Sequence, residues 1–89
     1  EFHMRNGLEI DIYCHKYWYK DSKLHREAGP AIEFTNGTKY WYKEGKLHRL
    51  DGPAIEWNDG NKEWFINGKN INVSSNEEFL RLVKLKAFI

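Results

Sequence analysis

The chain has 89 residues, a formal net charge of +1 and an aromatic content of 16%. This length allows one small domain with a modest core, so a binding surface is expected rather than a deep catalytic cleft. The balanced charge argues against an unselective nucleic-acid binder. The single cysteine, Cys14, cannot form an internal disulfide, which favours a reducing compartment. Residues 1–3, before Met4, resemble a cloning remnant, so 4–89 is taken as the domain.

A 23-residue unit occurs twice in succession, and fifteen of its 23 positions are identical in the two copies. The copies cover residues 16–38 and 39–61, a partial copy covers 62–73, and a truncated copy precedes the first. A tandem repeat predicts one structural unit used several times. It therefore favours a surface that presents the same groups repeatedly over a single catalytic centre.

Short turn signals punctuate every unit. Two-residue hairpin turns are predicted at Asn36-Gly37 and Asp59-Gly60, because both central positions of such turns need positive φ. The other end of each unit carries a second set of turns at Asp21-Ser22, Glu44-Gly45 and Asn67-Gly68. Gly29-Pro30 and Gly52-Pro53 then separate one unit from the next. The pattern predicts an antiparallel β-hairpin meander of about eight or nine short strands.

Pairing around these turns predicts the two faces of the sheet. A turn at Asn36-Gly37 would set Ile32 opposite Trp41, and a turn at Glu44-Gly45 would set Trp41 opposite His48. One predicted face carries Ile32, Phe34, Trp41 and His48, with Trp18 and His25 from the first copy. The other carries Glu33, Tyr40, Tyr42, Leu47 and Arg49, with Tyr17, Tyr19, Leu24 and Arg26 from the first copy.

The last part of the chain changes period. Ser74 and Ser75 precede Glu77 and Glu78, which gives two chances of a capping box. The apolar residues that follow predict one C-terminal α-helix over about residues 75–86. Its apolar side needs a partner, either the sheet or another chain. The expected fold class is therefore mainly β with one C-terminal helix.

No set of catalytic or metal-binding residues stands out. His25 and His48 are replaced by Ile71 in the third copy, so their position is interpreted as a packing position. No cysteine or carboxylate lies at zinc spacing beside them, and neither a phosphate loop nor a Ser/His/Asp set is present. We therefore expect no enzyme activity, no cofactor and no metal.

Repeated tyrosines, arginines and lysines are the candidate binding residues. Arg26 and Arg49 are predicted to lie across from tyrosines, where they either stack to bind RNA or a partner protein, or pair with Glu33 and Glu56 as a structural shield. The registered lysines either follow a phosphate backbone or keep the sheet soluble. The full candidate set is Tyr17, Tyr19, Tyr40, Tyr42, Arg26, Arg49, Lys16, Lys23, Lys39, Lys46 and Lys62.

The unit KLHR-x-x-GPAIE-x-x-x-G-x-K-x-W resembles a repeat of small proteins from tailed bacteriophages and giant DNA viruses. The closing copy WFINGK, followed by the segment SSNEEFLRL, is similar to the way those arrays end. A more distant likeness is to the MORN-type repeat. The resemblance implies a phage origin and a non-enzymatic role.

Together these observations predict a non-enzymatic, phage-encoded binding protein in the cytoplasm of an infected cell. The first hypothesis is an inhibitor of a host defence protein, such as a ribonuclease toxin, with RNA contributing to the complex. The alternative is a protein-interaction or assembly module without nucleic acid, with a homodimer through a sheet edge or the helix as one form. No apolar run is long enough to cross a membrane, so no membrane partner is expected.

Overall fold

The computed structural model describes residues 4–85. The suggested cloning remnant at 1–3 and the last predicted helical residue, Lys86, lie outside the described residues. The strands are β1 (Gly7–Ile10), β2 (Lys16–Lys20), β3 (Lys23–Leu24), β4 (Ile32–Glu33), β5 (Lys39–Tyr40), β6 (Tyr42–Lys43), β7 (Lys46–Leu47), β8 (Ile55–Glu56), β9 (Lys62–Ile66) and β10 (Lys69–Ile71), and the helix is α1 (Asn76–Lys84).

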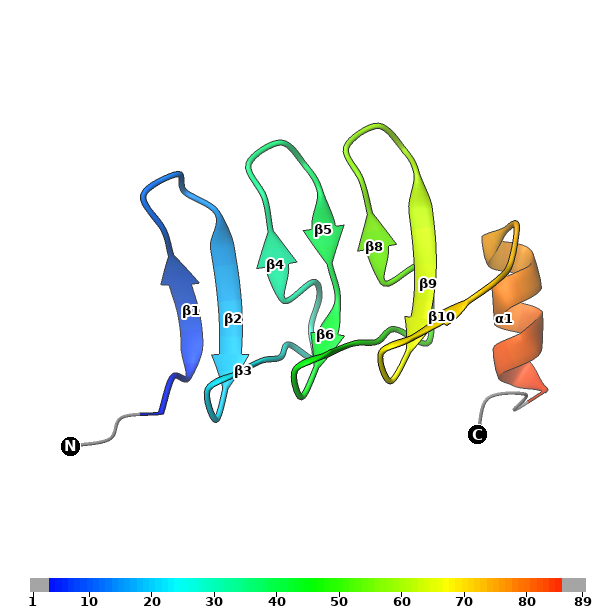
Figure 1. Cartoon of the computed structure of the whole chain (residues 1–89), viewed down its shortest axis with the longest axis horizontal. Helices are drawn as coiled ribbons and strands as arrows, with labels where there is room; N and C mark the ends of the chain where they lie inside the picture. Colours follow the sequence, from blue (N-terminus) through cyan, green and yellow to red (C-terminus); the bar gives the residue numbers. More distant parts are fainter. Residues whose placement is uncertain (1–3, 86–89) are drawn as a thin grey trace.

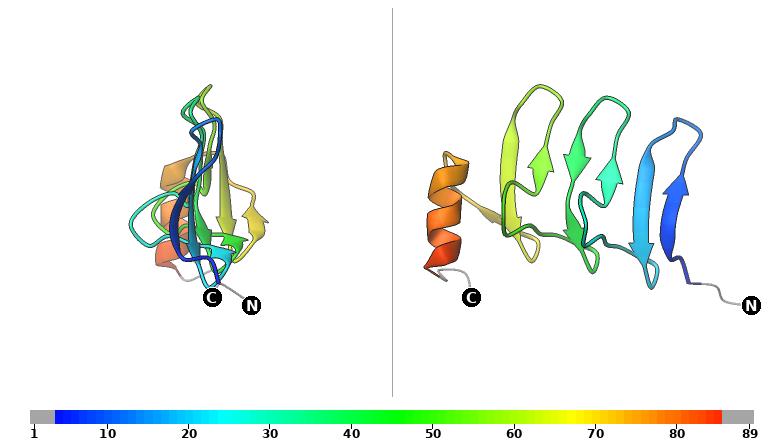
Figure 2. Two further views of the ribbon diagram at one scale, coloured as in Figure 1. Left: turned by 90° about the vertical axis from the view of Figure 1, so that its left-hand side faces the viewer. Right: turned by 180° about the vertical axis from the view of Figure 1, so that it is seen from behind.

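Three hairpins stand side by side and make one antiparallel sheet, with the helix beyond its C-terminal end (Figure 1). The sheet order is β1-β2-β4-β5-β8-β9-β10, with β3 on β2 and β6–β7 as a separate pair. The predicted mainly β meander with one helix is confirmed. Seen along the row of hairpins, they superpose into a thin layer (Figure 2), and the molecule measures 45 × 29 × 18 Å.

The two-residue turns have the predicted register. Tyr42 pairs with Leu47 and Lys43 with Lys46, so Glu44 and Gly45 form the turn, with φ of 50° and 83°. The same turn closes the first copy at Asp21-Ser22, although Ser22 stands where the second copy has glycine. Ser22 adopts φ of 65°, and its Oγ accepts a hydrogen bond from the Arg5 N–H at 2.9 Å.

The loops at the opposite end are one residue longer than predicted. Glu33 pairs with Lys39 and Ile32 with Tyr40, and the Phe34 N–H donates to the Thr38 carbonyl at 2.9 Å. The loop is therefore a three-residue turn that ends in Gly37 at φ of 97°. The third hairpin repeats this loop, with a hydrogen bond from the Trp57 N–H to the Asn61 carbonyl. The predicted two-residue loops at Asn36-Gly37 and Asp59-Gly60 are wrong.

The extra residue in each loop moves part of the predicted residues to the other face of the sheet, because successive strand residues point to opposite sides. Ile32 and Ile55 join the tyrosines, while Glu33 and Glu56 join the tryptophans. The tyrosine face consists of Tyr17, Tyr19, Tyr40, Tyr42, Leu24, Leu47, Ile32, Ile55, Phe34 and Phe65. The tryptophan face consists of Trp18, Trp41, Trp64, His25, His48, Arg26, Arg49, Glu33 and Glu56.

The helix packs at the C-terminal end of the tryptophan face. Phe79 is fully buried and packs with Trp64, Ile66 and Ile71. Trp64 Nε1 donates to Asn76 Oδ1 at 3.1 Å, which ties the first turn of α1 to β9. Of the two predicted capping sites, Ser75 is the one used, and its Oγ accepts from the Glu78 N–H at 3.2 Å. Within residues 4–85, no helix is long and apolar enough to cross a membrane.

Candidate functional site

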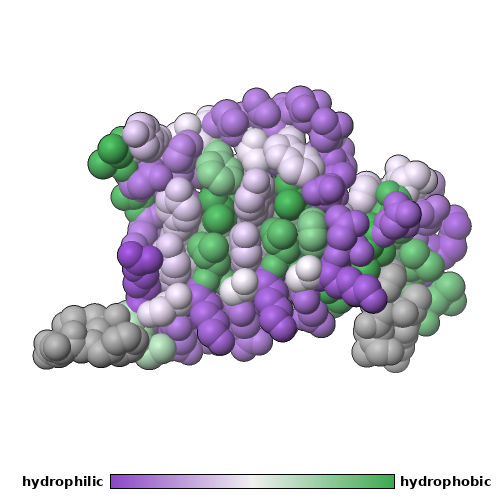
Figure 3. Space-filling view, viewed as in Figure 1, coloured by the Kyte–Doolittle hydropathy of each residue, from purple (hydrophilic) through white to green (hydrophobic). Residues whose placement is uncertain are grey.

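Within residues 4–85, no other element of the chain covers the tyrosine face. Tyr17, Ile32, Tyr40 and Ile55 follow one another across the sheet in a single row. Phe34 meets the Tyr40 ring edge-on at 5.2 Å between centroids, and the Tyr40 and Tyr42 rings lie 6.5 Å apart. The four tyrosines are half-buried by their neighbours on the sheet. In Figure 3, hydrophobic columns alternate with paler ones in the middle of the molecule, between hydrophilic upper and lower borders.

Two hydroxyl groups of this face, those of Tyr17 and Tyr42, have a raised pKa and remain protonated near neutral pH. A hydrogen bond from the Tyr17 hydroxyl to Asp11 Oδ2 at 2.9 Å, together with burial, raises the pKa of Tyr17. Burial and the neighbouring Tyr40 raise the pKa of Tyr42. Tyr17 and Tyr42 therefore offer neutral hydroxyl groups on this face. Arg5 lies at its N-terminal border, with its guanidinium 5.1 Å from the Tyr19 ring centroid.

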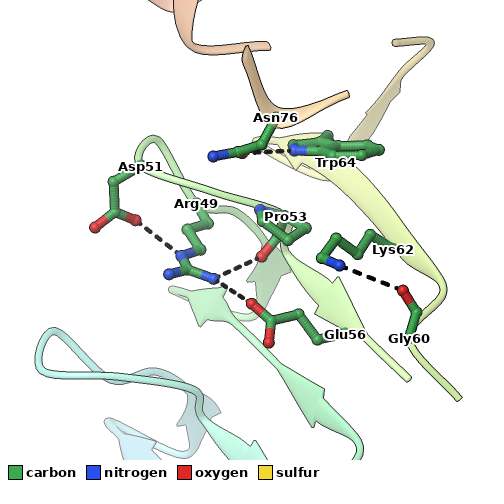
Figure 4. A network of polar contacts seen from close by, with 8 residues as sticks. All are labelled: Arg49, Asp51, Pro53, Glu56, Gly60, Lys62, Trp64 and Asn76. Atoms are coloured by element: carbon green, nitrogen blue, oxygen red, sulfur yellow. Dashed lines mark hydrogen bonds and ion pairs between the residues drawn. The ribbon is translucent and has the colours of Figure 1, made fainter. Parts of the chain in front are cut away.

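The two arginines do not stack on tyrosines, so that prediction is wrong. The Arg26 guanidinium lies 3.7 Å from the Trp18 ring centroid, and that of Arg49 lies 3.9 Å from Trp41. Arg49 Nη1 donates to the Pro53 carbonyl at 3.1 Å and to Glu56 at 2.9 Å (Figure 4). Arg26 makes the same bonds to Pro30 and Glu33.

Each arginine therefore holds its own Gly-Pro loop against the sheet. The arginine side chains are only 25% and 21% exposed, and both are paired with glutamates of the tryptophan face. A Cβ atom added at Gly52 would lie 2.8 Å from the Arg49 guanidinium carbon, so any other residue there would force the guanidinium to move. The geometry favours the structural interpretation of Arg26 and Arg49 over direct contact with RNA.

The predicted lysines fall into two groups. Lys16, Lys39 and Lys62 alternate with Glu33 and Glu56 across the sheet, so this row is not a continuous positive track. The second group lies along the edge formed by the two-residue turns and consists of Lys20, Lys23, Lys43, Lys46 and Lys69, all exposed. Only Asp21 and Glu44 oppose them on the turns of that edge.

The histidines connect neighbouring copies. His25 Nδ1 accepts a hydrogen bond from the Glu44 N–H at 2.9 Å, and His48 Nδ1 accepts one from the Asn67 N–H at 3.0 Å. In each case the donor is the first turn residue of the next copy. Asn6 Oδ1 accepts from the Asp21 N–H in the same way before the first copy. Because no further two-residue turn follows the third copy within residues 4–85, its equivalent residue, Ile71, packs in the core instead.

The opposite ends of the hairpins carry a second set of such links. His15 Nδ1 accepts from the Thr35 N–H at 3.0 Å, and Thr38 Oγ1 accepts from the Asn58 N–H at 3.2 Å. Nothing in this geometry groups the histidines with one another. In the part of the chain that the structure describes, no three His, Cys, Asp or Glu residues could together hold a metal ion.

Sequence reasoning placed the four tyrosines on one face but missed the apolar residues between them. The predicted two-residue loop places Ile32 on the opposite face, and the third hairpin repeats this error at Ile55. The tripeptide Thr35-Asn36-Gly37 suits the observed type I turn followed by a left-handed glycine, but Asn36-Gly37 suits a two-residue turn as well. Trp18 and Trp41 were recognised, but not as platforms for the arginines.

No family model matches this chain, and no curated protein or solved structure is significantly similar to it.

Proposed function

We propose that this chain is a non-enzymatic binding protein that docks another protein on its tyrosine face. The observation that carries the proposal is the row of half-buried tyrosines, with the buried Ile32 and Ile55 between them, on the side of the sheet that no other element of residues 4–85 covers. The Gly-Pro loops and α1 lie on the other side of the sheet, as the edge-on view indicates (Figure 2).

The chemistry of this surface suits a protein partner. Tyrosine is enriched at the energetic centres of protein interfaces because it combines a large apolar area with a hydrogen-bonding group. Charged groups stand at the ends of the central row, at Glu9 and Glu63, and not within it. The outline of 45 × 29 Å is broad enough for the roughly 800 Å² that each partner contributes to an interface of standard size.

RNA is the second candidate ligand, and the lysine edge favours it. The five turn lysines form a positive edge at the two-residue turns, which is the hydrophilic lower edge in Figure 3, and the strand register assigns them to the side of the tryptophan face. Lysines of this kind contact phosphates without reading sequence. In this version of the proposal, RNA bound at the edge adds to a protein complex formed on the tyrosine face.

The resemblance to phage repeats supports a more specific role. A small phage protein with a broad docking face would act by occupying a host defence protein, such as a ribonuclease toxin. The tyrosine face would then cover a functional surface of that host protein. This role depends on the resemblance, whereas the docking face depends on the geometry.

The docking proposal is tested by site-specific photo-crosslinking in infected cells. A photoreactive phenylalanine analogue placed at Tyr42 is expected to capture a discrete partner. The same analogue at Lys62, which is exposed and belongs to the opposite side of the sheet, is expected to capture none. Equal capture at both positions, or at neither, would refute docking on the tyrosine face.

The RNA component is tested separately. The ultraviolet absorbance of the purified complex is compared before and after a high-salt wash. A salt-sensitive signal at 260 nm supports phosphate contacts, because counterion release makes them salt-dependent. A protein-only spectrum at low salt would leave the complex without RNA and would refute the second candidate.

A further inference from the structure

The two connecting histidines differ in one respect. His25 Nε2 lies 2.9 Å from Glu27 Oε1, so both ring nitrogens of His25 are occupied. The residue equivalent to Glu27 in the second copy is Leu50, which has no polar atom in its side chain. Within residues 4–85, His48 Nε2 therefore has no hydrogen-bond partner.

The free nitrogen of His48 is a donor. Its Nδ1 accepts the Asn67 N–H, so the proton of the neutral ring is carried by Nε2. Burial and the nearby Lys43 ammonium lower the pKa of His48, which keeps the ring neutral near pH 7. His48 thus presents one N–H group, in a fixed orientation, from the tryptophan face.

His48 lines a basic depression. A hollow of about 590 Å³ is lined by Lys23, Lys43, Glu44, Lys46, His48, Leu50, Ile66 and Asn67. Lys43 and Lys46 are cross-strand partners, and the aliphatic stem of Lys23 lies against Gly45, 3.6 Å from the position of an added Cβ. Glu44 is the single carboxylate of the lining, against three ammonium groups.

We propose that this lysine–histidine depression binds a phosphate monoester dianion. In the first copy a carboxylate oxygen occupies the space beside the histidine Nε2, at 2.9 Å, so an anionic oxygen fits there. In the second copy an external anion takes that place. The excess of positive charge suits a dianion, and separate ammonium groups suit the spread oxygens of a phosphate better than the two coplanar oxygens of a carboxylate.

The proposal is tested by NMR with the whole chain and inorganic phosphate at constant ionic strength. Phosphate is expected to shift the His48 ring signals in a saturable manner and to leave those of His25 unchanged. Leu50→Glu supplies the missing carboxylate and is expected to weaken phosphate binding at least about tenfold, which corresponds to about 1.4 kcal/mol. Leu50→Ala, at an exposed position, is the matched control and should bind like the parent chain.

Three results would overturn the site. They are a shift that never saturates, equal shifts at both histidines, or equal binding by the Leu50→Glu and Leu50→Ala chains. Lys46→Gln provides a second variant, expected to weaken phosphate binding about threefold or more by removing one nearby charge. Circular dichroism of each variant confirms that binding is compared between folded chains.

A further arm identifies the source of the phosphate. Phosphoserine should displace inorganic phosphate, because both carry a dianionic group near neutral pH. A short oligouridylate with free hydroxyl ends carries only diester monoanions and should compete at least about tenfold less well per phosphate. Equal or better competition by the oligonucleotide would overturn the selectivity for monoesters. This inference does not depend on the tyrosine face, because a complex formed there can fail while phosphate still binds.

Discussion

At the scale of single residues, Cys14 holds a backbone conformation that suits glycine. It occupies the last position of the first three-residue loop at φ of 67°, where the later copies have Gly37 and Gly60. A left-handed conformation costs a residue with a side chain more than it costs glycine. Cys14→Gly should therefore stabilise the protein by about 1 kcal/mol, measured by urea unfolding.

Ser22 is the matched control for this change. It also has positive φ, but its Oγ accepts the Arg5 N–H, and glycine would lose that bond. Ser22→Gly should therefore gain less than Cys14→Gly. A loss of stability in the Cys14→Gly chain would show that the thiol makes a contribution larger than the backbone strain.

His48 should make stability depend on pH. Its folded pKa is lowered, by burial and by Lys43, below the ordinary value of 6.5. As the pH falls below about 6.5, His48 binds a proton in the unfolded chain before it does so in the folded chain. The free energy of unfolding is therefore highest above pH 6.5 and decreases as the pH falls towards the folded pKa. Urea unfolding between pH 7.5 and 5 should show this loss, and His48→Gln should show less of it. An equal pH dependence in both chains would place the titrating group elsewhere.

At the scale of structural elements, the Gly-Pro loop is fixed by one side chain. Arg49 stacks on Trp41 and bonds to Pro53 and Glu56. Arg49→Ala should cost about 2 kcal/mol in urea unfolding, because it removes charge-assisted hydrogen bonds in a partly buried setting. Arg5→Ala is the control, because the Arg5 side chain is 60% exposed and its ion pair with Glu9 is long, at 3.6 Å. This substitution should lower the free energy of unfolding by less than about 1 kcal/mol. Similar losses in both variants would contradict the structural role.

Some elements could be predicted from the sequence and others could not. The dipeptides Glu44-Gly45 and Asn67-Gly68 each suit a single type of short turn, so the pairing of Tyr42 with Leu47 could be predicted from the sequence. The tripeptide before Thr38 is compatible with a loop of two or of three residues, and the loop length decides on which face of the sheet Ile32 lies. That choice depends on long-range packing, as does the preference of Arg26 for an indole ring over a phenol. Local patterns do not contain that information.

At the scale of the whole molecule, packing is uneven along the array. The C-terminal end has a core formed by Trp64, Ile71 and Phe79, whereas Leu8 and Ile10 of β1 are 48% and 56% exposed. Hydrogen exchange should therefore be fastest in β1 and slowest in β9, because contacts are made only between neighbouring units. Phe79→Ala should cost about 3–5 kcal/mol and remove the protection of β9. Uniform exchange across the hairpins would indicate a single cooperative unit instead.

The links between copies have one further consequence, which concerns how such a chain changes over generations. Each link joins a side chain of one copy to a backbone N–H of the next, as His25 does with Glu44. Every residue except proline supplies that donor, so a newly inserted copy is compatible with its neighbours before any of its side chains has adapted. The gain or loss of one whole copy can therefore lengthen or shorten the sheet by one hairpin, with the end residues Asn6 and Ile71 left to close it.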